Sequence, residues 1–105
     1  PGITWLLTVA RVAQAAASFA VTRELEEGAA RVLLLYVDID SRPDDEDFQA
    51  EIEDLHWRLH AHRPDEVSLA ADVALWTQAE AIDGPVAAWT RLVSVLLRDP
   101  EFQGY

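Results

Sequence analysis

Residues 42–66 read RPDDEDFQAEIEDLHWRLHAHRPDE, a stretch that opens and closes on nearly the same phrase, at 42–46 and again at 63–66. A helix accepts proline in its first turn, and its dipole favours acids there. Each phrase therefore predicts the beginning of a helix. Between the phrases, apolar residues recur every three or four positions and predict one buried stripe: Phe48, Ile52, Leu55 and Leu59. The charged residues Glu51, Asp54 and Arg58 are expected to lie largely off it.

Two further helices are predicted towards the carboxyl end. After the second phrase, Leu69, Val73 and Trp76 continue the helical spacing. Asp83-Gly84-Pro85 predicts a capping residue followed by the start of a helix. Asp99-Pro100 predicts the end of that helix. Its buried face should comprise Trp89, Leu92, Val93, Leu96 and Leu97. The connections between these helices are only a few residues long, which favours antiparallel neighbours.

The first forty residues leave the fold class open, because Val32 to Val37 is an unbroken apolar run. Such a run is typical of a buried parallel strand, but also of the middle of a helix, and periodicity alone does not decide between them. The helical reading gives a stripe of Leu25, Ala29, Val32, Tyr36 and Ile39. We predict a mainly α fold, a single helical domain of four or five helices. The alternative is a three-layer α/β domain with strands near Ile3–Thr8, Val32–Ile39 and Val67–Val73.

The length of 105 residues, half of them apolar, is that of one domain spanning residues 1–105. The first residue is Pro1, so we expect a processed chain or a piece of a longer one. The absence of cysteine excludes disulfides, thiolate metal sites and a cysteine nucleophile. The predicted core contains Trp5, Phe19, Phe48, Leu55, Leu69, Trp76, Trp89 and Leu96.

The charge balance excludes one class of partner. All eight basic residues are arginine, and nineteen acids bring the net charge to −11. A chain this acidic repels phosphate backbones and anionic headgroups, so we expect no direct nucleic-acid binding. From Ile3 to Val21 the only charge is Arg11, but a central arginine costs about 2.5–3.5 kcal/mol on insertion scales, which disfavours a membrane span. We expect instead a buried helix that small residues let a neighbour approach: Ala10, Ala13, Ala17 and Ala20.

One constellation has the spacing of a metal site. Glu53, His56 and His60 share a helical face in the pattern of carboxylate-bridged iron or zinc centres. A second such motif is missing, so the site would need a dimer to complete its ligands. The alternative is a partly exposed helix face. No other cofactor is predicted.

Three other chemical functions have at most partial signals in the sequence. The acids between Asp38 and Asp54 could imitate a nucleic-acid backbone towards an arginine-rich protein, although solubilising charge and helix capping explain them more simply. In the α/β alternative, the segment Thr8–Ala17 would be a nucleotide-binding loop, degenerate because it lacks the required glycines. No serine stands in a nucleophile motif, so no catalytic residue is predicted and the chain is not expected to be an enzyme.

From Tyr36 onward the order of features resembles that of helical modules in bacterial exported proteins that also carry c-type cytochrome domains. The matching phrases are Tyr36-Val37-Asp38-Ile39-Asp40, Asp54-Leu55-His56, and Ala88 to Leu92 leading into Leu96 to Phe102. The resemblance implies an exported accessory segment without redox activity of its own, because no haem-attachment motif is present. Without that resemblance, a cytoplasmic location is expected.

The sequence therefore predicts a non-catalytic helical interaction or structural module, an accessory part of a larger protein or assembly. Its apolar amino-terminal helix is the segment expected to meet a protein partner or a second copy of the chain.

Overall fold

The computed structural model of the protein describes the backbone of residues 3–98 and the side chains of residues 11–98. This range contains four helices and no strand: α1 (Ile3–Leu25), α2 (Glu46–His60), α3 (Glu66–Asp83) and α4 (Pro85–Arg98). The mainly α prediction is confirmed, with four helices. The α/β alternative is wrong, because two of its three strands fall inside α1 and α3 and the third in a loop. Its nucleotide-binding loop, Thr8–Ala17, is likewise part of α1.

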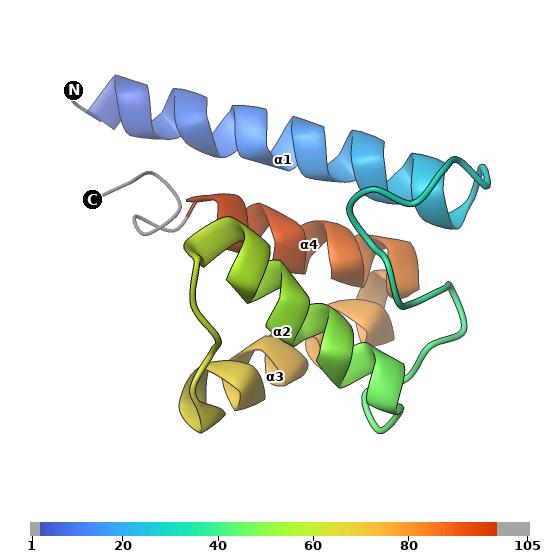
Figure 1. Ribbon diagram of the computed structural model, residues 1–105. Helices are drawn as coiled ribbons and strands as arrows, with labels where there is room; N and C mark the ends of the chain where they lie inside the picture. Colours follow the sequence, from blue (N-terminus) through green and yellow to red (C-terminus); the bar gives the residue numbers. More distant parts are fainter. Residues whose placement is uncertain (1–2, 99–105) are drawn as a thin grey trace.

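Helix α4 lies at the centre of the domain. It packs extensively against α1 and α3 and less so against α2, whereas α1 contacts no other helix of the described range. Figure 1 shows α1 running along one side of α4, with α2 and α3 on the other side. The tight turn between α3 and α4 is made by Gly84, whose φ of 91° is a conformation that side-chain-bearing residues rarely adopt. The protein is thus a three-helix core with a fourth helix laid on one face of α4.

The two repeated phrases do precede helices, but they act differently. Asp65 caps α3, since its carboxylate accepts a hydrogen bond from the Ser68 N–H at 2.7 Å. That bond holds the pKa of Asp65 below its ordinary value. Asp45 occupies the equivalent place before α2, but its carboxylate turns back and accepts from the Arg42 N–H at 2.9 Å. The prediction that acids cap the helices therefore holds for α3, while at α2 the acid stabilises the preceding turn.

An aromatic cluster forms the middle of the core. Phe48 from α2 contacts Trp76 from α3 and Trp89 from α4, with ring centroids 4.8 and 4.9 Å apart. All three side chains are fully buried, and Leu55 and Leu96 are buried as predicted. These residues hold three of the helices together through apolar contact.

Two other core predictions differ from the structure. Phe19 is 67% exposed, which makes its prediction wrong, and Leu69 is only partly buried. The reason at Phe19 is that α1 has a single neighbour, so only one of its faces is covered. That face carries Ala13 and Ala17, the small residues predicted to allow close approach, and it continues to Val21. Side chains as early in the chain as Trp5 lie outside the described residues.

None of the four described helices combines the length and apolar character that crossing a membrane requires.

Candidate functional site

The apolar run Val32 to Val37 is neither helix nor strand. It is an irregular loop that connects α1 to α2, so both predictions for it are wrong. Leu34 and Val37 point into the core, whereas Val32 and Tyr36 are exposed. A loop placed against the core has backbone N–H and C=O groups without ladder partners, and each must find another partner.

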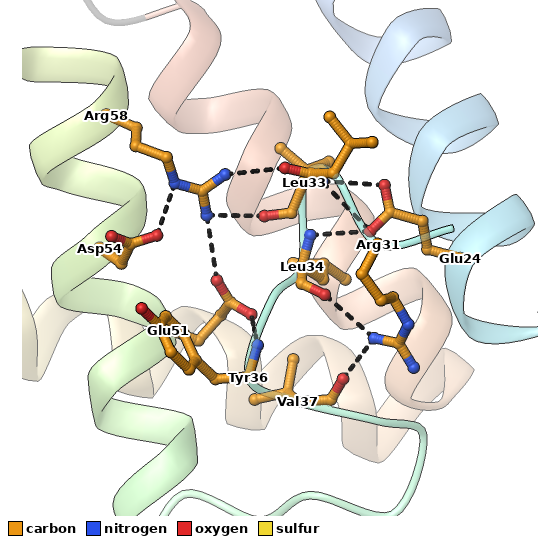
Figure 2. Close-up of polar contacts among 10 residues, drawn as sticks. Glu24, Arg31, Leu33, Leu34, Tyr36, Val37, Glu51, Asp54 and Arg58 are labelled. Atoms are coloured by element: carbon orange, nitrogen blue, oxygen red, sulfur yellow. Dashed lines mark hydrogen bonds and ion pairs between the residues drawn. The ribbon is translucent and has the colours of Figure 1, made fainter. Parts of the chain in front are cut away.

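Two acidic side chains supply those partners for the N–H groups (Figure 2). The carboxylate of Glu24, near the end of α1, accepts from the N–H groups of Leu33 and Leu34 at 2.9 and 2.8 Å. The carboxylate of Glu51, in the middle of α2, accepts from the Tyr36 N–H at 2.8 Å. Both carboxylates are buried. They take the place that a neighbouring strand would have filled.

Two arginines do the same for the carbonyl groups. Arg31 donates from Nη1 to the carbonyls of Leu34, at 3.1 Å, and Val37, at 2.5 Å. Arg58 of α2 donates from Nη1 to the Val32 carbonyl and from Nη2 to the Leu33 carbonyl, at 3.0 and 2.7 Å. Figure 2 shows Glu24 and Arg31 on one side of the loop backbone and Glu51 and Arg58 on the other; Arg31 is itself a loop residue that folds back on the loop's own carbonyls. We call residues 31–37 the anchored loop.

The anchored loop depends on a buried carboxyl group. Glu51 is fully buried, and its second oxygen lies 3.2 Å from Arg58, whose Nε in turn lies 2.5 Å from Asp54. Burial raises the pKa of Glu51, although the Tyr36 N–H and the nearby Arg58 oppose the rise. The prediction that Glu51 lies off the buried stripe is wrong. The signal was present, because position 51 lies three residues after Phe48 and four before Leu55.

The raised pKa predicts how stability changes with pH. Because the folded-state pKa of Glu51 lies above its ordinary value of 4.5, its contribution to stability is fully present below that value. It is lost as the pH rises through the folded-state pKa. Glutamine at this position does not titrate, so the melting temperature of wild type relative to Glu51→Gln should fall as the pH rises above the ordinary value of 4.5. Thermal unfolding followed by circular dichroism measures this, and a constant or growing difference would contradict the assignment.

The structure separates the predicted metal ligands. His56 is buried, with Nε2 2.5 Å from an Asp72 oxygen, and His60 places its Nε2 3.0 Å from the Leu96 carbonyl. The two imidazole rings lie 5.2 Å apart, but Glu53 lines a groove on the surface of α2 together with Tyr36. No group of three histidine, aspartate or glutamate side chains within residues 11–98 is arranged to hold a metal ion. A metal on Glu53, His56 and His60 thus stays a prediction that this geometry does not favour.

Part of the acidic cluster also has a local explanation. Asp38 accepts from the Asp40 N–H at 2.8 Å, as Asp45 does from the Arg42 N–H. These carboxylates shape the turn before α2. Mimicry of a nucleic-acid backbone by residues 38–54 stays a prediction.

The outer face of α1 is where the predicted burial of apolar side chains differs most from the burial in the structure. Val12 is 63% exposed and Phe19 67%, and the alanines between them, Ala15 and Ala16, are exposed as well. These four residues recur at spacings of three, one and three, so they lie on one side of the helix. We call them the α1 outer face. It is apolar, and nothing in the described part of the chain covers it.

Comparison with known proteins adds no family. No family model matches the chain, and no curated protein or solved structure is significantly similar to it. The resemblance to modules of exported proteins with cytochrome domains therefore stays a prediction.

Proposed function

We propose that this protein is a non-catalytic interaction module whose α1 outer face pairs with the same face of a second copy. The observation that carries the proposal is the exposure of Val12 and Phe19 on a helix that packs against α4 alone. Exposed apolar faces of this kind mark contact surfaces. The wider proposal, that the module is an accessory part of a larger protein or assembly, rests on the same exposed apolar face.

Self-pairing is favoured by the order of residue sizes along the face. Val12, Ala15, Ala16 and Phe19 read large, small, small, large. A two-fold axis requires each patch to be its own complement. In an antiparallel pair centred between the alanines, Val12 of one copy would meet Phe19 of the other, and the alanines would meet at the centre. This arrangement allows the two helices to approach closely.

The distribution of charge also supports this surface. Along residues 11–23 the only charges are Arg11 and Arg23, although the chain carries −11 in total. The acid-rich helix α2 lies on the opposite side of α4 (Figure 1). Two copies that meet through α1 thus keep their most acidic elements apart. The remaining repulsion between two acidic chains is screened by salt, so association should strengthen as the ionic strength rises.

Replacing Val12 and Phe19 with serine tests the proposal. Wild type should show concentration-dependent dimerisation in sedimentation equilibrium or light scattering, stronger at about 0.3 M than at about 0.03 M salt. The double variant should remain monomeric at the same concentrations, because the apolar area that drives pairing is removed. We expect a dissociation constant in the micromolar range or weaker, since one helix face per copy should bury less than the roughly 1,200 Å² of a standard interface.

The matched control is Val67→Ser with Ile82→Ser, which removes two exposed apolar side chains from α3 instead. It should dimerise like wild type. A strictly monomeric wild type, or an equal loss in both double variants, would overturn the proposal.

A further inference from the structure

A groove lies between the anchored loop and α2. It has a volume of about 320 Å³ and is lined by Tyr36, Ala50, Glu53, Asp54, Trp57 and Arg63. This surface is independent of the α1 outer face, because it is built from α2 and the segments on either side of it.

Two exposed aromatic side chains form walls of the groove. Tyr36, from the anchored loop, is 48% exposed, and Trp57, from α2, is 59% exposed. Neither contributes to the buried core. Tyr36 is held in place through its backbone, because its N–H is bound to the buried Glu51. The backbone that carries Tyr36 therefore requires little ordering before a ligand binds.

Of the two carboxylates that line the groove, one is already ion-paired and the other is not. Asp54 is paired with Arg58, whose Nε lies 2.5 Å from its carboxylate. Glu53 forms no ion pair with any described residue, and its carboxylate lies one helical turn before Trp57. Arg63, which follows α2 in the chain, also lines the groove and carries the opposite charge. The groove therefore offers one unneutralised carboxylate beside an aromatic ring, in a chain whose net charge attracts cations.

The same chain contains a filled example of this combination. On α3, Trp76 and Glu80 are also one turn apart, and together they hold Arg42. The Arg42 guanidinium lies over the Trp76 ring, 5.5 Å from its centroid, and 3.2 Å from the Glu80 carboxylate. A guanidinium suits such a pair, because it is planar, stacks on aromatic faces and is weakly hydrated. On α2 the order is reversed, with Glu53 before Trp57, and no arginine of the described range lies over Trp57.

We propose that the groove between Tyr36 and Trp57 binds an arginine side chain of a protein partner, with its guanidinium over the Trp57 ring and paired with Glu53. The tyrosine forms the opposite wall, and Arg63 weakens the site by repulsion. Because attraction between opposite charges drives this contact, it should weaken with salt, whereas pairing through the α1 outer face should strengthen.

A peptide titration of the full chain tests the proposal. The probe is acetyl-Gly-Arg-Gly-amide, and the matched control peptide carries glutamine in place of arginine. The readout is the indole N–H signal of Trp57 in nitrogen-15 NMR spectra, assigned by its loss in Trp57→Phe. The arginine peptide should shift this signal in a saturable way, with a dissociation constant in the millimolar range because only one side chain is engaged, and the glutamine peptide should not.

Two charge variants show whether the groove binds a cation or an anion. Glu53→Gln should weaken binding of the arginine peptide about threefold, and Arg63→Gln should strengthen it about twofold, in keeping with the size of exposed charge pairs. Both side chains lie outside the core, so the fold should persist. The proposal is overturned by an absence of a saturable shift, by an equal shift with the glutamine peptide, or by opposite signs in the two variants, which would indicate an anion site. None of these outcomes bears on dimerisation.

Discussion

Replacing Phe48 with alanine is expected to lower the free energy of unfolding by about 3–5 kcal/mol, the usual cost of removing a buried phenylalanine. Phe48 is fully buried and contacts both Trp76 and Trp89, so the change would open a cavity where α2, α3 and α4 meet. Domains of this size are stable by only about 5–15 kcal/mol, which makes the loss a large share of the total. Urea unfolding followed by tryptophan fluorescence measures it.

Phe19→Ala is the matched control, because Phe19 is the same residue type but exposed on α1. Its stability should stay within about 0.5 kcal/mol of wild type, as is usual for surface positions. Similar losses in the two variants would mean that α1 is covered in the monomer and that the assignment of its outer face is wrong.

Replacing Glu24 with alanine is expected to cost about 2–4 kcal/mol, even though an acidic side chain near a helix end is usually dispensable. Its carboxylate is the acceptor for the N–H groups of both Leu33 and Leu34, and an N–H group that loses its partner in the interior costs about 1–3 kcal/mol. The effect should be local as well as global. Hydrogen exchange should accelerate at the Leu33 and Leu34 amides more than at the Tyr36 amide, which Glu51 holds.

Two variants serve as controls for this prediction. Glu24→Gln retains one acceptor oxygen and should lose less stability than Glu24→Ala. Glu26→Ala removes an exposed acid from the turn that follows α1 and should have little effect. If Glu24→Ala proved as mild as Glu26→Ala, the anchored loop would not depend on this carboxylate.

The helices after residue 42 could be predicted because their signals are local. The repeated phrases, the apolar spacing from Phe48 to Leu59 and the turn at Gly84 each act within a few residues, and the structure places α2, α3 and α4 accordingly. The buried aromatic side chains also followed from that spacing. Such patterns report which face of a helix is apolar, and a core forms wherever those faces meet.

The prediction failed where a residue's surroundings come from distant parts of the chain. Phe19 looked like a core residue, but the fold brings α1 only one neighbour. The three residues of the metal prediction share a helix, but two of them face α3 and α4 while Glu53 faces the groove. Spacing along one helix does not specify what the neighbouring helices present to it.

The sequence by itself determined a mainly helical domain, the beginning of each carboxyl-terminal helix and most of the aromatic core, since propensity and apolar periodicity are properties of short segments. Only the tertiary structure decided the state of residues 31–37. In an apolar run with no periodicity, the backbone N–H groups bind whatever acceptors the fold supplies. Here the acceptors are the side-chain carboxylates of Glu24 and Glu51, which approach the run from two different helices. The tertiary structure likewise decided which apolar side chains remain uncovered, because burial depends on how many neighbours a helix has.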